Sequence, residues 1–205
     1  MAPIDSPLTL SLALLACWAV VGAAGLLRTH SVALVGRVLF PLGAIIGVGL
    51  AIVAALSLTE PVEHATLHIG LPDLPMHVRL DNLSRVFLAL LGSASAGVSL
   101  FAAGYFRKGE GTAPGVLGLQ YHLFLASMGF VLVADDAYAF MVAWETMALT
   151  SYFLVTAQHG IPEIRSYFRM NTDPICFFGP TGFNLLGIDR WVRNFQYLVY
   201  YDSWD

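Results

Sequence analysis

The stretch MVAWETMALTSYFLV, residues 141–155, decides the fold of this 205-residue chain. It lies inside an apolar segment from about 137 to 157, which is long enough to cross a bilayer as a helix. A helix that enters the membrane near Asp136 rises about 1.5 Å per residue and carries Glu145 roughly 13 Å inward, close to the middle of a core about 30 Å thick. The stretch therefore predicts a transmembrane helix with one acid at its centre.

Glu145 is the only residue of this stretch that is charged at neutral pH. A carboxylate at that depth costs several kcal/mol unless it is protonated, paired or in contact with water, so an intramembrane acid is a functional candidate. The alternative is a Glu145 that is neutralised or serves only a helix contact. We expect the side of the helix that carries Glu145 to face other helices rather than lipid. Helical geometry places on this side Tyr138, Met141, Val142, Leu149 and Tyr152.

Composition also predicts an all-α membrane protein. Hydrophobic residues make up 57% of the chain and charged residues 12%, compared with about a quarter charged in ordinary soluble domains. The net charge of -4, without a basic patch, argues against a nucleic-acid partner. Cys17 and Cys176 are far apart, so the sequence indicates neither a disulfide framework nor a metal cluster.

Five apolar segments predict five transmembrane helices. The flank before the first has no lysine or arginine, which is wrong for a cleavable signal peptide, so this helix is expected to stay. In the second, Gly43 and Gly47 are spaced for close packing, and Pro41 would at most kink the helix. The third begins after a predicted N-cap, Asp81, and carries small residues at 92–97. The helices are expected at about 8–27, 38–58, 82–104, 115–133 and 137–157.

Between residues 60 and 80 apolar and polar residues alternate on both sides of the turn PDLP (72–75), which predicts a short β-hairpin outside the membrane. His64, His68 and His77 lie on this hairpin. They have no thiol or carboxylate at ligand spacing, so we expect solvent-facing histidines and no metal. Arg85, one turn into the next helix, is interpreted as structural, either paired with Asp81 or reaching the interface.

A second candidate site residue is His122, near the start of the fourth helix. It has two interpretations: a proton relay that faces Glu145, or a buried, hydrogen-bonding histidine close to the interface. Asp135 and Asp136 form a short acidic turn into the helix that carries Glu145.

Two motifs resemble a known superfamily. WExMxLxSYFLV (144–155), followed by His159, resembles the fifth-helix signature of the proton-translocating, antiporter-like subunits of respiratory complex I and membrane-bound hydrogenases. LDxLSxxF (80–87), followed by GYF (104–106), resembles the start of their third helix. The Phe-Leu-Val ending and the histidine look most like the B component of hydrogenase-4 and its formate hydrogenlyase counterpart.

This resemblance, from about residue 8 to 169, implies a subunit of a redox-driven proton pump of the hydrogenase-4 or NADH:quinone oxidoreductase type. It implies that Glu145 is a proton carrier paired with a lysine on a later helix. Redox chemistry would belong to partner membrane subunits, because this chain has no cysteine cluster, no phosphate-binding loop and no nucleotide fingerprint, and no cofactor is expected. The alternative is a redox-independent cation/proton antiporter subunit.

Charge in the loops predicts the orientation. Basic residues collect near 28–37, 107–108 and 165–169, in alternate loops, and acidic residues collect in the intervening ones. By the positive-inside rule, we expect the N-terminus and the hairpin outside and residues after 157 in the cytoplasm, with the chain in the inner membrane.

Residues 170–205 form a separate, aromatic-rich tail that does not match the superfamily and has no apolar run of 18 residues. We expect a truncated, frameshifted or fused reading frame there, in which case the product could be non-functional. The alternative is a native cytoplasmic or interfacial appendage whose aromatic residues dock at the membrane surface.

Overall fold

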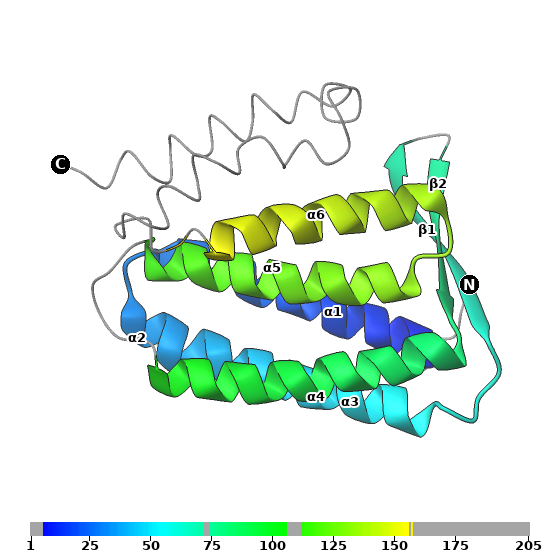
Figure 1. Cartoon of the computed structure of the whole chain (residues 1–205), viewed down its shortest axis with the longest axis horizontal. Helices are drawn as coiled ribbons and strands as arrows, with labels where there is room; N and C mark the ends of the chain where they lie inside the picture. Colours follow the sequence, from blue (N-terminus) through cyan, green and yellow to red (C-terminus); the bar gives the residue numbers. More distant parts are fainter. Residues whose placement is uncertain (1–5, 72–73, 106–111, 156, 158–205) are drawn as a thin grey trace. The chain divides into compact units, whose positions relative to one another are not determined.

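The computed structural model describes residues 6–71, 74–105, 112–155 and 157, and the chain divides into two compact units (Figure 1). The first unit, residues 1–108 and 113–154, contains the helices and strands apart from the last residue of the final helix. In the second unit, the N–H and the hydroxyl of Thr112 both donate to the carbonyl of Ala157, at 2.9 and 3.1 Å. His159, the basic residues near 165–169 and the tail lie outside the described residues.

Five helical segments in the described part of the chain are long and apolar enough to cross a membrane, which confirms the predicted number. Each begins with a recognisable cap or proline: Ser6 accepts from the N–H of Thr9 at 3.2 Å, and Asp81, the predicted N-cap, accepts from the N–H of Ser84 at 2.8 Å. The segments are α1 (Pro7–Ala24) with the 3-10 turn η1 (Gly25–Arg28), α2 (Val32–Leu34) with the π turn η2 (Val35–Leu39) and α3 (Phe40–Leu56), α4 (Asn82–Tyr105), α5 (Pro114–Val133) and α6 (Ala137–Val155).

The second of these spans starts at Val32 rather than at the predicted residue 38. Ser31 caps it by accepting from the N–H of Leu34 at 3.3 Å, so the helix continues past Arg37 instead of starting after it. The π turn ends at Leu39, two residues before Pro41, which has no N–H for the carbonyl four residues earlier. The wider turn lets the helix pass through the proline.

The predicted hairpin consists of β1 (Glu63–Leu71) and β2 (Leu74–Leu80), which pair in antiparallel fashion with Thr66 opposite His77. The register shifts between Leu67 and Gly70, as at a β-bulge. The hairpin stands at the end of the helices where α4 and α6 begin (Figure 1). The structure confirms the hairpin itself, while its side of the membrane remains a prediction.

Arg85 holds the loop that leads into this hairpin. Its side chain is fully buried, and its guanidinium donates to the carbonyls of Glu60 and Pro61 at 2.6 and 2.7 Å and to Asn82 Oδ1 at 2.9 Å. Arg85 is therefore structural, as expected, but its partners are loop carbonyls rather than Asp81. Each donor satisfies a backbone group next to the membrane, where an unpaired carbonyl is costly.

Glycines let the helices approach closely. A Cβ on Gly47 of α3 would stand 2.8 Å from the carbonyl oxygen of Gly92 of α4, and a Cβ on Gly115 of α5 would stand 2.3 Å from the carbonyl oxygen of Gly25. These contacts join α3 to α4 and α5 to the end of the first span, consistent with the predicted small-residue packing faces. The main apolar core between these helices and the hairpin contains Leu8, Leu15, Trp18, Leu50, Ala54, Val78, Leu80, Leu88, Leu125, Ala126 and Val133.

Candidate functional site

Glu145 lies near the middle of α6 and is half-buried. The buried side of α6 is formed mainly by small and apolar residues, and at 100° per residue Glu145 lies about 120° around the helix from the middle of this side. Among the residues that the structure describes, no hydrogen bond or ion pair involves the Glu145 carboxyl. The buried side consists of Ala139, Ala143, Thr150 and Phe153.

The threonine and serine hydroxyls of α6 are satisfied within the helix itself. Thr146 donates to the carbonyl of Val142 at 2.8 Å, Thr150 donates to the carbonyl of Thr146 at 2.8 Å, and Ser151 makes a similar bond. Such bonds to the preceding turn are how hydroxyls are accommodated in an apolar span. The carboxyl of Glu145, by contrast, makes no such bond within the helix.

His122 has no exposed surface and lies where α5 meets α1 and α3. Its Nδ1 is 2.7 Å from the carbonyl oxygen of Gly118, one turn earlier in α5. A Cβ on Gly22 would stand 3.0 Å from His122 Cβ, and a Cβ on Gly43 would stand 2.5 Å from His122 Nε2. Two glycines therefore make the space that the imidazole occupies.

A polar cluster surrounds this imidazole. The hydroxyl of Tyr121 is 2.9 Å from that of Ser99 in α4, and the Tyr121 ring packs edge to face on Phe40 with centroids 5.3 Å apart. Trp18 Nε1 donates to the carbonyl of Gly43 at 3.1 Å, so α1 and α3 are joined beside the histidine. The cluster combines side chains from four helices around one titratable group.

Several buried polar atoms in the described residues lack a hydrogen-bond partner, including His122 Nε2, Ser11 Oγ and both amide atoms of Gln120. Nε2 faces the backbone of the second span near Leu39 and Gly43 but reaches no acceptor with good hydrogen-bond geometry. An unpaired polar group in an apolar interior costs several kcal/mol, so these atoms are places where water or a proton would be stabilised.

His122 and Glu145 are not joined by a hydrogen bond or an ion pair within the described residues. The contacts of His122 are with α1, the second span and its own helix, whereas Glu145 is on α6. Of the two interpretations of His122, a buried, hydrogen-bonding histidine is the one that agrees with its burial and with its contact to Gly118. Its role as a relay stays a prediction, and it would require an intervening group.

The sequence reasoning missed the junction between the hairpin and α6. Asp135 donates its N–H to the carbonyl of His77 at 3.0 Å, and the N–H of His77 donates to the carboxylate of Asp136. Asp136 also caps α6 by accepting from the N–H of Ala139 at 2.7 Å, and these bonds, with that of Ala139 first, lower the pKa of Asp136. The acidic pair that immediately precedes a helix was the sequence signal for this junction.

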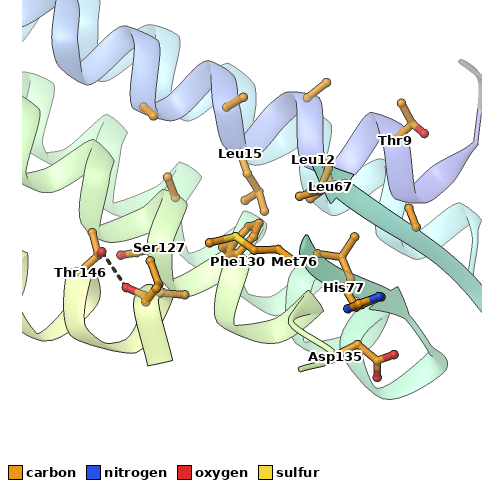
Figure 2. Close-up of a pocket in the computed structure, with 18 of the residues that line it drawn as sticks. Thr9, Leu12, Leu15, Leu67, Met76, His77, Ser127, Phe130, Asp135 and Thr146 are labelled. Atoms are coloured by element: carbon orange, nitrogen blue, oxygen red, sulfur yellow. Dashed lines mark hydrogen bonds between the residues drawn. The ribbon is translucent and has the colours of Figure 1, made fainter. Parts of the chain in front are cut away.

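A groove of about 1260 Å³ lies between the hairpin, α1, α5 and α6. Figure 2 shows Leu12 and Leu15 of α1, Phe130 of α5 and Met76 of β2 along it, with the hydroxyls of Ser127 and Thr146 at one end and Asp135 at the other. Thr146 is next to Glu145 in sequence, but Glu145 itself does not line the groove. The groove is mainly apolar, and α6 contributes Val142, Ala143 and Thr146, which lie on one side of that helix.

No protein-family model matches the chain. A segment of 124 residues, 59% of the chain, is 37% identical to an uncharacterized protein of Mycobacterium tuberculosis, of which it covers 18%. A segment of 89 residues, 43% of the chain, is 34% identical to hydrogenase-4 component B of Escherichia coli, of which it covers 13%. The chain thus spans less than a fifth of the length of the curated relatives that it matches. The five apolar helices, for their part, indicate a multi-pass membrane protein.

Proposed function

We propose that this chain is part of a proton-translocating membrane subunit of a redox-driven complex, of the hydrogenase-4 or NADH:quinone oxidoreductase type. Glu145 is its intramembrane proton carrier. The observation that carries the proposal is a half-buried carboxyl in the middle of an apolar span, with no ion pair among the described residues. The partial similarity to hydrogenase-4 component B supports the class of complex.

Glu145 suits proton transfer because its two protonation states differ strongly in their interaction with the surroundings. The neutral acid is stable in an apolar span, whereas the carboxylate requires water or a cation nearby. A cation that approaches and withdraws would therefore drive uptake and release of the proton. The sequence has a single lysine, Lys108, outside α6, so this cation would come from a neighbouring segment or subunit.

His122 is proposed as a second proton-binding group. Imidazole is the side chain whose ordinary titration range is closest to neutral pH, and the unpaired Nε2 of His122 can accept a proton. The hydroxyls of Tyr121 and Ser99 would supply further donors and acceptors in the same cluster. Since no direct contact joins His122 to Glu145 in the described residues, transfer between them would pass through water.

The proposed setting is the inner membrane, with the N-terminus and the hairpin outside and residues after α6 in the cytoplasm. Other membrane subunits of a hydrogenase or a complex I-like assembly would carry out the redox reaction, in keeping with the name of the Escherichia coli relative. The loop charges described above support this orientation.

The test uses inverted membrane vesicles that contain the assembled complex. Proton uptake is followed with a pH-sensitive dye while the redox donor is supplied, for the wild type, Glu145→Gln and Glu145→Asp. We expect the Gln variant to lose most of the proton uptake and the Asp variant to retain part of it. Glu60→Gln is the matched control, because Glu60 is an exposed loop acid whose carbonyl, not its carboxyl, binds Arg85.

Wild-type proton uptake in an assembled Glu145→Gln complex would exclude Glu145 as the carrier. Proton exchange that depends on sodium and on Glu145, but not on the redox donor, would replace the proposed pump with the cation/proton antiporter. The two results are distinguished in one set of vesicles by adding the donor and the sodium gradient separately.

A further inference from the structure

Two histidines of the hairpin face the two aspartates that precede α6. His64 Nδ1 lies 3.6 Å from Asp135 Oδ2, and His77 Nδ1 lies 3.5 Å from Asp136 Oδ2. Arg79 adds a permanent cation, with its Nε 3.4 Å from Asp135 Oδ1. We call these five residues the α6 clasp.

The clasp also contains backbone contacts. The N–H of Asp135 donates to the carbonyl of His77, Val78 forms an isolated antiparallel bridge with Ala134, and the Asp136 carboxylate accepts from the N–H of His77. Because Asp136 is at the same time the N-cap of α6, the hairpin is attached directly to the first turn of that helix.

Other charged groups near the clasp are few in the described residues. The carboxylate of Glu63 in β1 accepts a hydrogen bond from the N–H of Leu8 at 3.1 Å. The carboxylate of Asp81, before α4, forms an ion pair with Arg79 at 3.3 Å. The ends of α1 and α5 that adjoin the hairpin bring no charged side chain among these residues. Arg85 and Glu60 lie at the loop before the hairpin. When the histidines are neutral, the acids Glu60, Glu63, Asp81, Asp135 and Asp136 outnumber the cations Arg79 and Arg85, so the junction carries excess negative charge.

We propose that the α6 clasp is a proton sensor, in which protonation of His64 and His77 tightens the attachment of the hairpin to the start of α6. The inference goes beyond the proposed function and does not depend on it, because it concerns only the junction outside the membrane span.

The direction of the effect follows from charge. An imidazolium is attracted to the adjacent carboxylate, whereas a neutral imidazole is not, so the attraction is present when the imidazoles are protonated at acidic pH and is lost when they are neutral at higher pH. Asp136 stays ionised near neutral pH, since its pKa is lowered by the N–H groups of Ala139 and His77. Both clasp histidines are largely exposed, so protons exchange freely with the solvent.

The clasp matters for α6 because this helix makes fewer close backbone approaches to other elements than α1, α3, α4 or α5 do. Its first turn depends on Asp136 for a cap and on the hairpin for lateral attachment. Solvent pH on the hairpin side would therefore set how firmly the N-terminal end of the Glu145 helix is held.

The test measures hydrogen exchange of the His77 and Asp135 amides, which form the two hydrogen bonds of the junction. The full chain is studied in lipid nanodiscs from pH 5 to 8, and rates are corrected for intrinsic chemical exchange. In the wild type, protection is expected to fall as the pH rises, by about 1.4- to 5-fold for each exposed ion pair. In His64→Gln/His77→Gln, protection is expected to be independent of pH and equal to the alkaline wild-type level.

Two variants complete the design. His30→Gln removes an exposed histidine outside the clasp and should retain the wild-type pH profile. Asp135→Asn/Asp136→Asn keeps the imidazoles and a capping side chain but removes the carboxylates, and it should also abolish the pH dependence. The amide of Thr9, capped by Ser6, reports whether each variant keeps its fold. Wild-type pH dependence in either folded double variant would overturn the proposal.

Discussion

His122 fills the space that a side chain at Gly43 would need: a Cβ on Gly43 would stand 2.5 Å from His122 Nε2. The ring has little freedom to move away, because it is fully buried and its Nδ1 is held at 2.7 Å from the carbonyl oxygen of Gly118. The backbone of α3 at Gly43 therefore packs directly on the imidazole of α5.

We predict that Gly43→Ala lowers the free energy of unfolding by about 1–3 kcal/mol, as is usual when a packed interior receives an extra methyl group. Thermal unfolding in detergent micelles measures the change. Gly97→Ala in α4 is the control, since no atom lies within 4 Å of a Cβ there, and its effect should not exceed about 1 kcal/mol. In a His122→Ala background the Gly43→Ala penalty should shrink, and an undiminished penalty would show that the contact is not its cause.

Gly92→Ala should cost more than Gly43→Ala. A Cβ on Gly92 would stand 2.5 Å from the carbonyl oxygen of Gly47 and 2.7 Å from the backbone nitrogen of Ala51, and backbone atoms of a packed helix cannot turn aside as a side chain can. Unfolding in detergent is again the measurement, with Gly104→Ala as the control in an open part of the same helix. Equal effects of Gly92→Ala and Gly104→Ala would contradict the close approach of α3 and α4.

Replacing Arg85 by methionine should destabilise the loop before the hairpin. The carbonyls of Glu60 and Pro61 would lose charge-assisted hydrogen bonds, which we expect to cost at least about 1.5 kcal/mol. Arg79→Met removes only exposed ion pairs and should cost about 1 kcal/mol or less. Limited proteolysis at residues 57–62 and thermal unfolding of both variants test the difference, and a larger effect from Arg79→Met would refute it.

Stability should fall in acid through Asp136 and Asp81. Backbone hydrogen bonds, from Ala139 to Asp136 and from Ser84 to Asp81, lower the pKa of each carboxyl from its ordinary value of 3.8. A lowered pKa in the folded state gives stabilisation that is present above the ordinary value and is lost as the pH falls through the lowered one. Asn caps a helix but does not ionise, so the stability difference between the wild type and Asp136→Asn should shrink below about pH 4. A constant difference from pH 6 to 3 would exclude this contribution.

Local features of the fold could be predicted from the sequence because their causes are close together in it. The apolar length around Glu145 predicts α6, Asp81 lies three residues before the amide that it caps, and the spacing of Gly43 and Gly47 indicates a packing face. The alternation at 60–80 likewise predicts a two-stranded hairpin.

Other features depended on distant partners and could not be predicted from one segment. Arg85 binds carbonyls 24 and 25 residues earlier in the chain. The imidazole of His122 is placed by glycines on two other helices, which no pattern around His122 indicates. The start of the second span was predicted too late because a charged residue, Arg37, was assigned to the basic turn before the helix, whereas Ser31 caps the helix earlier.

The candidate site likewise has one feature that the local sequence predicts and one that depends on distant partners. The position of Glu145 in an apolar helix is a property of sequence alone, but its counter-charge is a tertiary property, and none is found among the described residues. The proton carrier, the relay and the membrane orientation accordingly stay predictions, and the Glu145→Gln variant tests the first of them.

The close contact of Gly25 with Gly115 also constrains how the protein is made. The first span packs more extensively on α5 than on α3, yet the two glycines are separated by about 90 residues, which a ribosome needs roughly 5 to 18 s to add at 5–20 residues per second. During that interval α1 is inserted while its principal neighbour is still unsynthesised. Its glycine face must therefore stay free of other small-residue helices until α5 leaves the translocon.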